Sequence, residues 1–241
     1  MIDLKGKRAL VTGGSRGIGA ATALLLAECG ANVGIGYRNR EKDAEEVVRK
    51  IASLGVRGFA HAADISTAAG TESLFARAAR ELGGLDLFVG NAGIWPFDDI
   101  PIGEMDDDRW HTTMRVNLDS MFTTTRAAVR AISDHGRIVL VSSTAGQRGE
   151  AGHSDYAASR GAMISFVKSV AVELAPRDIT VNSVAPGWVD TEMAAASLVG
   201  DGRARIERTI PLGRIASARC FASIRRSPAS PSKNAGSAAW R

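Results

Sequence analysis

Residues 9–19 of the chain read ALVTGGSRGIG, an apolar run that leads directly into a cluster of glycines spaced G-x-x-x-G-x-G. Gly13 permits a tight turn from strand to helix, Gly17 lets the backbone approach a phosphate, and Gly19 lets the helix pack closely on the sheet. The free N–H groups at the start of that helix then form an anion site, which the helix dipole strengthens. The stretch predicts a strand–turn–helix unit that binds a nucleotide; a glycine-rich turn without a ligand is the plainer alternative.

Short apolar runs alternate with helical patterns along the rest of the chain, and this alternation predicts a parallel sheet with helices on both faces. We expect strands at Arg8–Thr12, Asn32–Tyr37, Val56–Ala62, Leu85–Val89, Arg137–Ser142 and Thr180–Ala185. Helices are expected near 17–29, 41–54, 67–82, 106–133, 155–175 and 191–209. Because crossovers between parallel strands are right-handed, the predicted fold class is α/β, a doubly wound, Rossmann-type parallel sheet in a single domain.

The composition fits one globular domain and excludes several other classes of protein. The chain has 241 residues, of which 45% are hydrophobic and 23% charged. It contains no apolar run of about 18 residues and begins without a signal-peptide pattern. Cys29 and Cys220 are too few for a disulfide framework and match no metal-ligand spacing. We therefore expect a cytoplasmic protein with no membrane partner and no metal.

The basic charge of the chain is concentrated at its C-terminal end. The net charge is +4, but residues 218–241 hold five basic residues and no acidic one, which leaves 25 basic and 26 acidic residues before Ala218. A near-neutral body argues against a nucleic-acid partner. We expect a dinucleotide-binding oxidoreductase domain at 1–217 and an atypical basic Arg/Ser/Ala tail at 218–241. A flexible tail is favoured over an irregular cap on the sheet edge, and a basic arm for anionic polymers is a third possibility.

The end of the second expected strand indicates which nucleotide binds. The residues RNR follow it at positions 38–40, with no acidic residue before Glu41. An NAD site usually has an acidic residue here that binds the ribose 2′-hydroxyl. Arg38 and Arg16 instead offer two guanidinium groups that suit a 2′-phosphate. The sequence favours NADP(H) over NAD(H), with two solvated surface arginines as the alternative.

Further motifs resemble, in order, those of the short-chain dehydrogenase/reductase family. TGxxxGIG stands at 12–19, NAG at 91–93, and a serine at 143 precedes a tyrosine at 156. Together with PG at 186–187, the matches extend over residues 7–213, and the chain is identified as a member of that family. The segments YRN at 37–39 and PLGR at 211–214 are most similar to its 3-oxoacyl-acyl-carrier-protein reductase group.

The resemblance implies a set of cofactor contacts. The glycine turn would hold the pyrophosphate, Asp64-Ile65 would contact the adenine, and residues 186–191 would close over the nicotinamide carboxamide. The cofactor-binding residues expected are Gly13, Ser15, Arg16, Gly17, Ile18, Gly19, Arg38, Asp64, Ile65, Asn91, Ala92, Gly93, Pro186, Gly187, Val189 and Thr191.

The catalytic group implied by the resemblance is Asn117, Ser143, Tyr156 and Arg160. Tyr156 would exchange a proton with the substrate oxygen, Ser143 would hydrogen-bond that oxygen, and Asn117 would support the active-site backbone and a water. The family has a lysine, which also binds the cofactor ribose, where this chain has Arg160. Arginine keeps a positive charge one helical turn from the tyrosine, which favours the phenolate. It cannot be deprotonated, however, and its planar head differs from an ammonium.

These residues predict an NADP-dependent oxidoreductase that interconverts a ketone, such as a 3-oxoacyl thioester, and a secondary alcohol. We expect Arg160 to slow this enzyme rather than inactivate it. The alternative is a nucleotide-binding family member with little or no turnover, which Arg160 and the altered C-terminus favour. The resemblance further implies a homotetramer with residues 106–133 and 155–175 at one interface. It also implies a final strand, and we expect this sequence to lack that strand after Ala216.

A few other residues near these motifs carry weaker expectations. The residues that follow the cofactor motifs and could form a substrate wall, or simply pack, are Trp95, Phe97, Trp188 and Met193. His153 is expected to be solvated, with a substrate contact as the alternative. The acidic run 106–108 is interpreted as charge at a helix start. The basic residues at 203, 205 and 208 are interpreted as a solvated lid helix rather than a surface for an acidic carrier protein.

Overall fold

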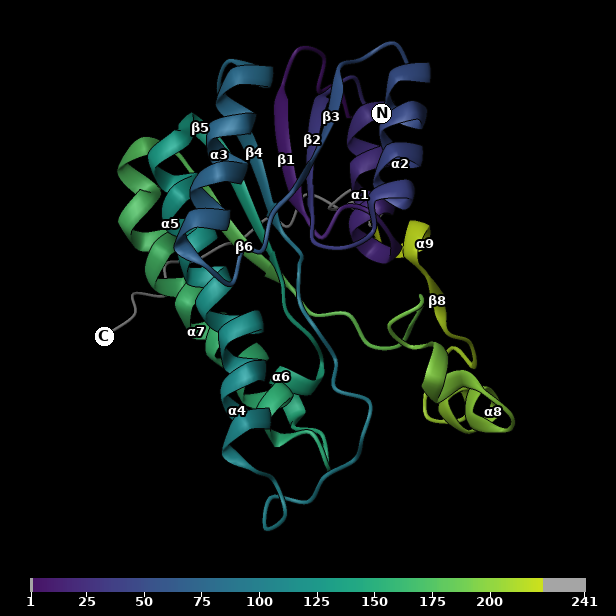
Figure 1. The fold of residues 1–241 in the computed structure, drawn as a ribbon. Helices are drawn as coiled ribbons and strands as arrows, with labels where there is room; N and C mark the ends of the chain where they lie inside the picture. Colours follow the sequence, from purple (N-terminus) through teal and green to yellow (C-terminus); the bar gives the residue numbers. More distant parts are fainter. Residues whose placement is uncertain (1, 223–241) are drawn as a thin grey trace, which may run out of the picture.

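The computed structural model describes residues 2–222 and places six strands in one parallel sheet (Figure 1). The strands are β1 (Arg8–Thr12), β2 (Asn32–Tyr37), β3 (Gly58–Ala62), β4 (Leu85–Gly90), β5 (Ile132–Val141) and β6 (Thr180–Val184). Their order is β3-β2-β1-β4-β5-β6, and every neighbouring pair is parallel. This order reverses between β1 and β4, as in doubly wound dinucleotide-binding folds. The predicted fold class is therefore confirmed.

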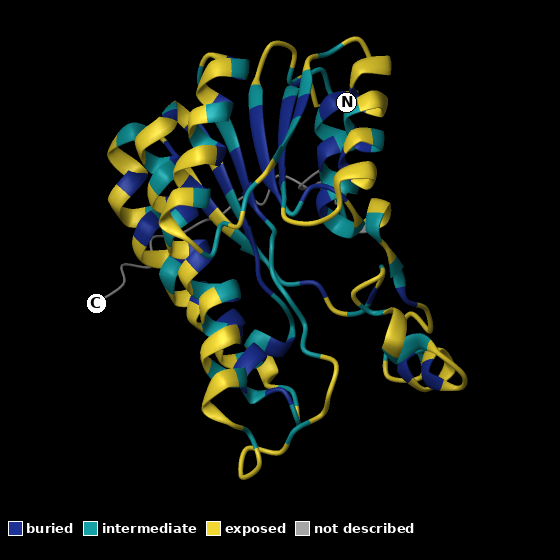
Figure 2. Cartoon of the chain, viewed as in Figure 1, coloured by how far each residue is buried: buried dark blue, intermediate teal, exposed yellow. Residues whose placement is uncertain are grey.

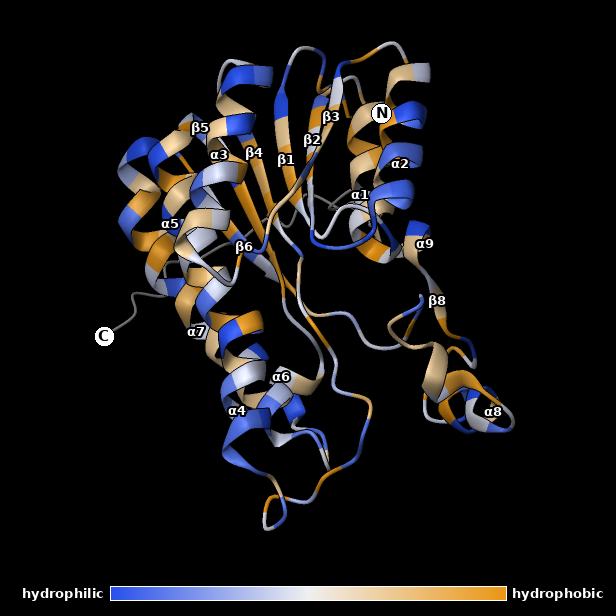
Figure 3. Ribbon diagram, viewed as in Figure 1, coloured by the Kyte–Doolittle hydropathy of each residue, from blue (hydrophilic) through white to orange (hydrophobic). Residues whose placement is uncertain are grey.

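Helices cover both faces of the sheet (Figure 1). One face carries α1 (Gly17–Glu28) and α2 (Glu41–Ser53), and the other carries α3 (Ala68–Leu82), α5 (Ser120–Ala131) and α7 (Ser154–Leu174). A separate apolar cluster fills each interface, with Val33 and Ile35 central to the first and Phe88 and Leu140 central to the second. The central strands β1 and β2 are buried and apolar along most of their length, while the helices turn polar faces outward (Figures 2 and 3).

Local sequence signals set the ends of several helices. Thr67 caps α3 by accepting a hydrogen bond from the Gly70 N–H, and Gly83 ends that helix in the left-handed conformation at φ 72°. The Asp106 side chain likewise accepts from the Arg109 N–H at the start of α4 (Asp107–Met114). The interpretation of the acidic run as charge at a helix start is thus confirmed.

Two helices differ from the sequence prediction. The expected helix at 106–133 is α4, a π-helical turn at Arg115–Asp119 and α5 in succession, after which β5 begins at Ile132. The expected helix at 191–209 is wrong. A 3₁₀ turn at Ala195–Leu198 is separated from the short helix α8 (Gly202–Glu207) by Gly200, whose φ of 61° cannot continue a right-handed helix.

The remaining short elements lie near the edges of the molecule. They are α6 (Ala145–Arg148), a 3₁₀ turn (Ala175–Arg177), β7 (Val189–Asp190), β8 (Ala216–Ser217) and α9 (Ala218–Ala222). In α9, Arg219 forms an ion pair with Glu28 of α1 at 2.8 Å. The flexible tail expected from the sequence falls mostly on residues 223–241, which lie outside the described residues.

The sheet ends at β6 in the part of the chain that the structure describes. Within residues 2–222, β6 pairs with β5 only, and β7 pairs with β8 in a separate two-residue ladder. Over the same residues, no helix is both long and apolar enough to cross a membrane.

Candidate active site

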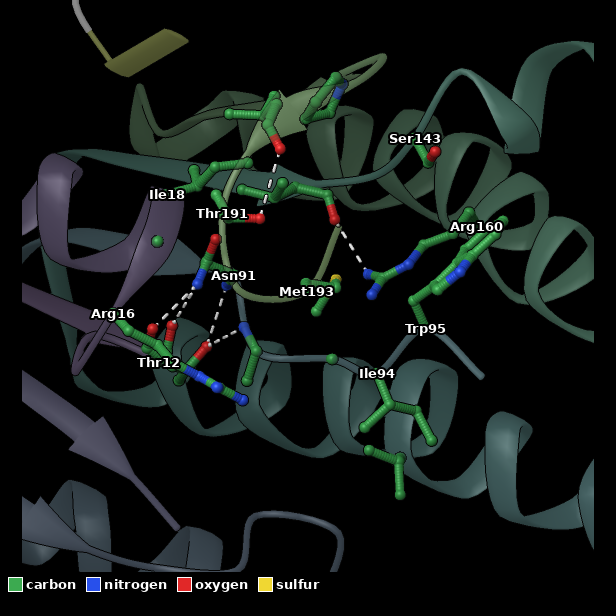
Figure 4. A pocket seen from close by; sticks show the side chains of 18 of the residues that line it. Thr12, Arg16, Ile18, Asn91, Ile94, Trp95, Ser143, Arg160, Thr191 and Met193 are labelled. Atoms are coloured by element: carbon green, nitrogen blue, oxygen red, sulfur yellow. Dashed lines mark hydrogen bonds between the residues drawn. The ribbon is translucent and has the colours of Figure 1, made fainter. Parts of the chain in front are cut away.

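A pocket of about 520 Å³ opens where the strand order reverses, at the carboxyl ends of β1, β4 and β5 (Figure 4). Ligands bind at this place in doubly wound sheets because the flanking loops diverge there. All of the site residues expected from the sequence line the pocket except Gly19 and Asn117. The structure therefore brings together groups that come from most of the chain's length.

The glycine turn forms one end of the pocket. Gly13 has a φ of 63°, a left-handed conformation that favours glycine. Gly19 lies outside the pocket, where a Cβ atom would collide with the Gly13 carbonyl oxygen, so its role is close packing. No side chain caps the start of α1 and its first turn contains no acidic residue. The N–H groups of that turn are therefore suited to an anion.

Thr12 ties this turn to the end of β4, a role that the sequence analysis did not assign. Its hydroxyl accepts hydrogen bonds from the N–H groups of Asn91 at 3.0 Å and Ala92 at 3.1 Å (Figure 4). In return, the Asn91 amide donates to the carbonyl oxygens of Thr12 at 3.0 Å and Gly13 at 3.2 Å. The sequence indicates this role only through the position of Thr12, a polar residue at the end of a buried strand.

Two arginines lie at the rim of the same end. Arg16 and Arg38 are exposed, line the pocket and form no ion pair within the described residues. Nearby, hydrogen bonds from Ser66 hold the pKa of Asp64 below its usual value, and the positive charge of Arg38 adds to this effect. The rim is thus cationic and available to an anionic group.

Asn117 lies behind the pocket on the π-helical turn and is fully buried. Its amide oxygen accepts from the Ile94 N–H at 2.8 Å, and its amide nitrogen donates to the Ile94 carbonyl at 3.1 Å and the Ser159 hydroxyl at 3.3 Å. π-helical turns often mark functional sites because they redirect one side chain. Here the turn allows Asn117 to hold the backbone that follows β4.

Tyr156 and Arg160 both project from α7 into the other end of the pocket, and both are buried. The Arg160 guanidinium carbon lies over the Tyr156 ring, 5.1 Å from its centre. One terminal nitrogen donates to the Val141 carbonyl at 3.0 Å and the other to the Asn117 amide oxygen at 3.4 Å, while the buried Nε has no partner in the described residues. A Cβ atom at Gly93 would collide with this guanidinium.

Ser143 follows β5 and lines the same pocket. Its hydroxyl oxygen accepts from the Ala145 N–H at 3.1 Å, which orients it at the start of the short helix α6. Its O–H donates to no group within the described residues, so it can donate to a ligand.

A buried ion pair fixes the start of α7 and was not anticipated from the sequence. Asp155 is fully buried, and it accepts from Arg109 at 3.1 Å and from the Thr113 hydroxyl at 2.7 Å. Burial alone would raise the pKa of Asp155, but the hydrogen bonds from Thr113 and Arg109 bring it below its usual value. Arg109 also donates to the carbonyl oxygens of Asp98 and Gly152, so it joins two loops beside Tyr156.

The expectation that His153 is solvated is wrong. The residue is 2% exposed, because its ring stacks on Trp95 with centres 3.9 Å apart and its Nε2 lies 2.8 Å from the Pro96 carbonyl oxygen. These partners are far away in the sequence, so no local pattern shows the burial. Of the expected substrate-wall residues, Trp95, Trp188 and Met193 line the pocket, whereas Phe97 does not and is 61% exposed.

No group of three or more His, Cys, Asp or Glu residues within 2–222 could hold a metal ion. The three basic residues at 203, 205 and 208 lie in or next to α8, where Arg203 forms an ion pair with Asp190 at 2.7 Å.

Comparison with known proteins indicates the same family as the sequence motifs. A family model described as short chain dehydrogenase matches residues 7–200. The chain is 40% identical over 219 residues to the 3-oxoacyl-[acyl-carrier-protein] reductase FabG of Escherichia coli, an alignment that covers 90% of this chain and 87% of the relative.

Solved structures agree with this relationship. A short chain dehydrogenase from Burkholderia cenocepacia in complex with NADP superposes with a TM-score of 0.84 at 39% identity, over 91% of this chain and 88% of that one. A blue fluorescent protein from a metagenomic library, in complex with NADPH, gives a TM-score of 0.84 at 35% identity, over 91% and 89%. This chain belongs to the short-chain dehydrogenase/reductase family of NAD(P)-dependent oxidoreductases and resembles its 3-oxoacyl-acyl-carrier-protein reductases.

Proposed function

We propose that the protein is an NADPH-dependent reductase that converts a ketone to a secondary alcohol, with 3-oxoacyl thioesters as one substrate class. The single observation that carries this proposal is that the required groups line one pocket. Tyr156, Ser143 and Arg160 line the same cavity as the uncapped glycine turn. A proton donor, a hydroxyl donor and an anion site thus converge on one space.

The residues present fit a dinucleotide phosphate. The turn around Gly13 and Gly17 leaves room for backbone N–H groups to contact a pyrophosphate. Arg16 and Arg38, exposed and without ion-pair partners in the described residues, suit a ribose 2′-phosphate. The complexes of two structural neighbours with NADP and NADPH support the same preference.

NADPH, when bound, supplies the hydride that reduces the carbonyl carbon. The chain's own residues manage the oxygen. Ser143 donates a hydrogen bond to it, and Tyr156 gives it a proton as negative charge develops there. The positive charge of Arg160 over the Tyr156 ring then stabilises the phenolate that remains until solvent returns a proton. Asn117 holds the backbone at Ile94, which keeps this wall of the pocket in place.

The alternative function is nucleotide binding with little or no turnover. One observation favours it: the Arg160 guanidinium is already bound to Val141 and Asn117, which fixes its position against the protein. We nevertheless infer slow turnover, because the charge stays beside Tyr156.

The test is steady-state oxidation of NADPH and NADH with a panel of 3-oxoacyl thioesters and simple ketones. We expect turnover with NADPH and a much higher KM with NADH, and Tyr156→Phe should abolish the activity. Binding of NADPH with no turnover of any carbonyl would establish the alternative.

We also propose a homo-oligomer, a tetramer by family resemblance. Exposed apolar side chains on the outer faces of two helices, Phe122 on α5 and Val172 on α7, support such an interface. The division into a domain at 1–217 and a basic tail, and the cytoplasmic location, stay predictions.

A further inference from the structure

Three aromatic residues line the Tyr156 end of the pocket, Trp95, Tyr156 and Trp188, and His153 packs behind Trp95. The Trp95 ring stacks on His153, meets the Tyr156 ring edge-on with centres 4.6 Å apart, and meets the Trp188 ring at 6.3 Å and 68°. Trp95 and Trp188 both line the pocket and are half-buried. An aromatic wall therefore adjoins the phenol that the proposed reaction uses.

The two tryptophans come from different parts of the chain. Trp95 lies in the loop after β4, and Trp188 lies in the segment between β6 and β7. Each can present a ring face or edge to a ligand that enters between these segments. Flat rings gain more from such contacts than flexible alkyl chains do, because aromatic pairs have favourable edge and offset geometries and a rigid ligand loses less entropy.

Trp95 is held in place before a substrate arrives. His153 covers one of its faces at 3.9 Å and is anchored by its Nε2 contact with the Pro96 carbonyl at 2.8 Å. The other ring nitrogen of His153 faces Asp99 at 3.3 Å and the Ala151 carbonyl at 3.4 Å. With both nitrogens engaged and the ring 2% exposed, the imidazole is a rigid support rather than a group that reaches the substrate.

We propose that this aromatic cluster, defined as Trp95, His153, Tyr156 and Trp188, makes the site selective for ketones that carry a flat ring beside the carbonyl. Within it, His153 is a positioning residue that holds the Trp95 indole as the substrate wall. The inference rests on the proposed reductase function and narrows its substrate class.

The experiment compares two ketones with the same number of carbons, acetophenone and 2-octanone, under NADPH with the full chain. We expect kcat/KM for acetophenone to exceed that for 2-octanone by about fivefold. Trp95→Ala should bring that ratio close to one, and Trp95→Phe should retain most of it. His153→Ala should lower the ratio through a higher KM for acetophenone, with a smaller change in KM for 2-octanone.

Phe97→Ala is the matched control, because Phe97 is an aromatic residue of the same loop that does not line the pocket. It should leave the ratio unchanged. Unaltered NADPH affinity in each variant, measured by cofactor fluorescence, shows that the fold is intact. Equal use of the two ketones by the wild type, or equal loss on both in Trp95→Ala, would overturn the inference.

Failure of the proposed function is a separate outcome. If no ketone or thioester is reduced, ligand-observed NMR compares binding of acetophenone and 2-octanone to the NADP-loaded wild type and Trp95→Ala. Preferential binding of acetophenone that depends on Trp95 supports the aromatic site even without turnover. Equal binding of the two ketones, or binding that Trp95→Ala leaves unchanged, contradicts it.

Discussion

Arg160 lies against the face of the Tyr156 ring, with its guanidinium carbon 5.1 Å from the ring centre and its terminal nitrogens bound to Val141 and Asn117. The charge is close to the phenol, but these bonds fix the guanidinium against the protein. The positive charge is therefore retained beside Tyr156, but the guanidinium cannot move as freely as the ammonium group of a lysine could.

Arg160→Lys should therefore raise the turnover of a reducible ketone by about tenfold, less than the ~10²-fold or more typical of a whole acid–base group, because Arg160 already supplies the charge. The lysine side chain is a flexible point charge that can shift toward the reacting oxygen. The measurement is kcat from NADPH oxidation, with Tyr156→Phe as the inactive reference. An unchanged or lower kcat, in a variant that binds NADPH normally, would show that arginine does not limit the rate.

Arg38→Glu should reverse the cofactor preference. The new carboxylate repels a 2′-phosphate and can accept a hydrogen bond from a ribose 2′-hydroxyl, as acidic residues at this place do in NAD sites. We expect KM for NADPH to rise by about 10- to 100-fold, with a small change in KM for NADH. Lys42→Glu, which makes the same change of charge at an exposed α2 residue that does not line the pocket, serves as the control. Equal effects of the two variants would mean that Arg38 acts only through net charge.

Asp155→Ala should lower the free energy of unfolding by about 3 kcal/mol, because it leaves Arg109 partly buried without its ion-pair partner and the Thr113 hydroxyl without its acceptor. Asp155→Asn keeps the shape and should cost less. Chemical denaturation measures both, and the reference is Glu46→Gln, which removes an exposed charge of α2.

The same carboxylate gives stability a defined pH dependence. Since the folded-state pKa of Asp155 lies below its unfolded value of about 3.9, its stabilisation is complete above that value and is lost as the pH falls through the folded-state pKa. Asp155→Asn should accordingly weaken the pH dependence of the free energy of unfolding in the acid range. An acid limb identical to that of the wild type would assign this pH dependence to other carboxyl groups, such as Asp86 beside Arg8.

Thr12→Val should destabilise the fold by about 1–3 kcal/mol and weaken NADPH binding. The substitution keeps the shape of the side chain but leaves the N–H groups of Asn91 and Ala92 without their acceptor. Thr12→Ser restores the hydroxyl and should recover most of both properties. Thermal unfolding and cofactor titration test the pair. If Thr12→Val lowers stability but leaves the affinity for NADPH unchanged, Thr12 supports the fold and not the cofactor site.

The periodic elements of this fold could be predicted from sequence because their signals are local. Apolar runs such as residues 9–11 and 33–35 identify the buried strands, and the glycine spacing identifies the turn that joins β1 to α1. The helix expected at 191–209 failed because Gly200 adopts a left-handed conformation that its neighbours do not show.

The parts of the site that sequence could not predict depend on contacts between distant segments. His153 is buried by Trp95 and Pro96, which precede it by more than fifty residues. The role of Asp155 follows from Arg109 and Thr113 on another helix, and nothing beside Asp155 indicates them. The motif at 91–93 predicts the place of Gly93 but not that a side chain there would strike Arg160.

That last contact couples two positions that lie 67 residues apart in the chain. Any replacement of Gly93 brings its Cβ against both the Arg160 guanidinium and the Asn117 amide oxygen, so both groups have to shift before the new side chain fits. Arg160→Lys would relieve the first of these collisions and leave the second, so the stability cost of a change at position 93 should depend on which residue stands at position 160.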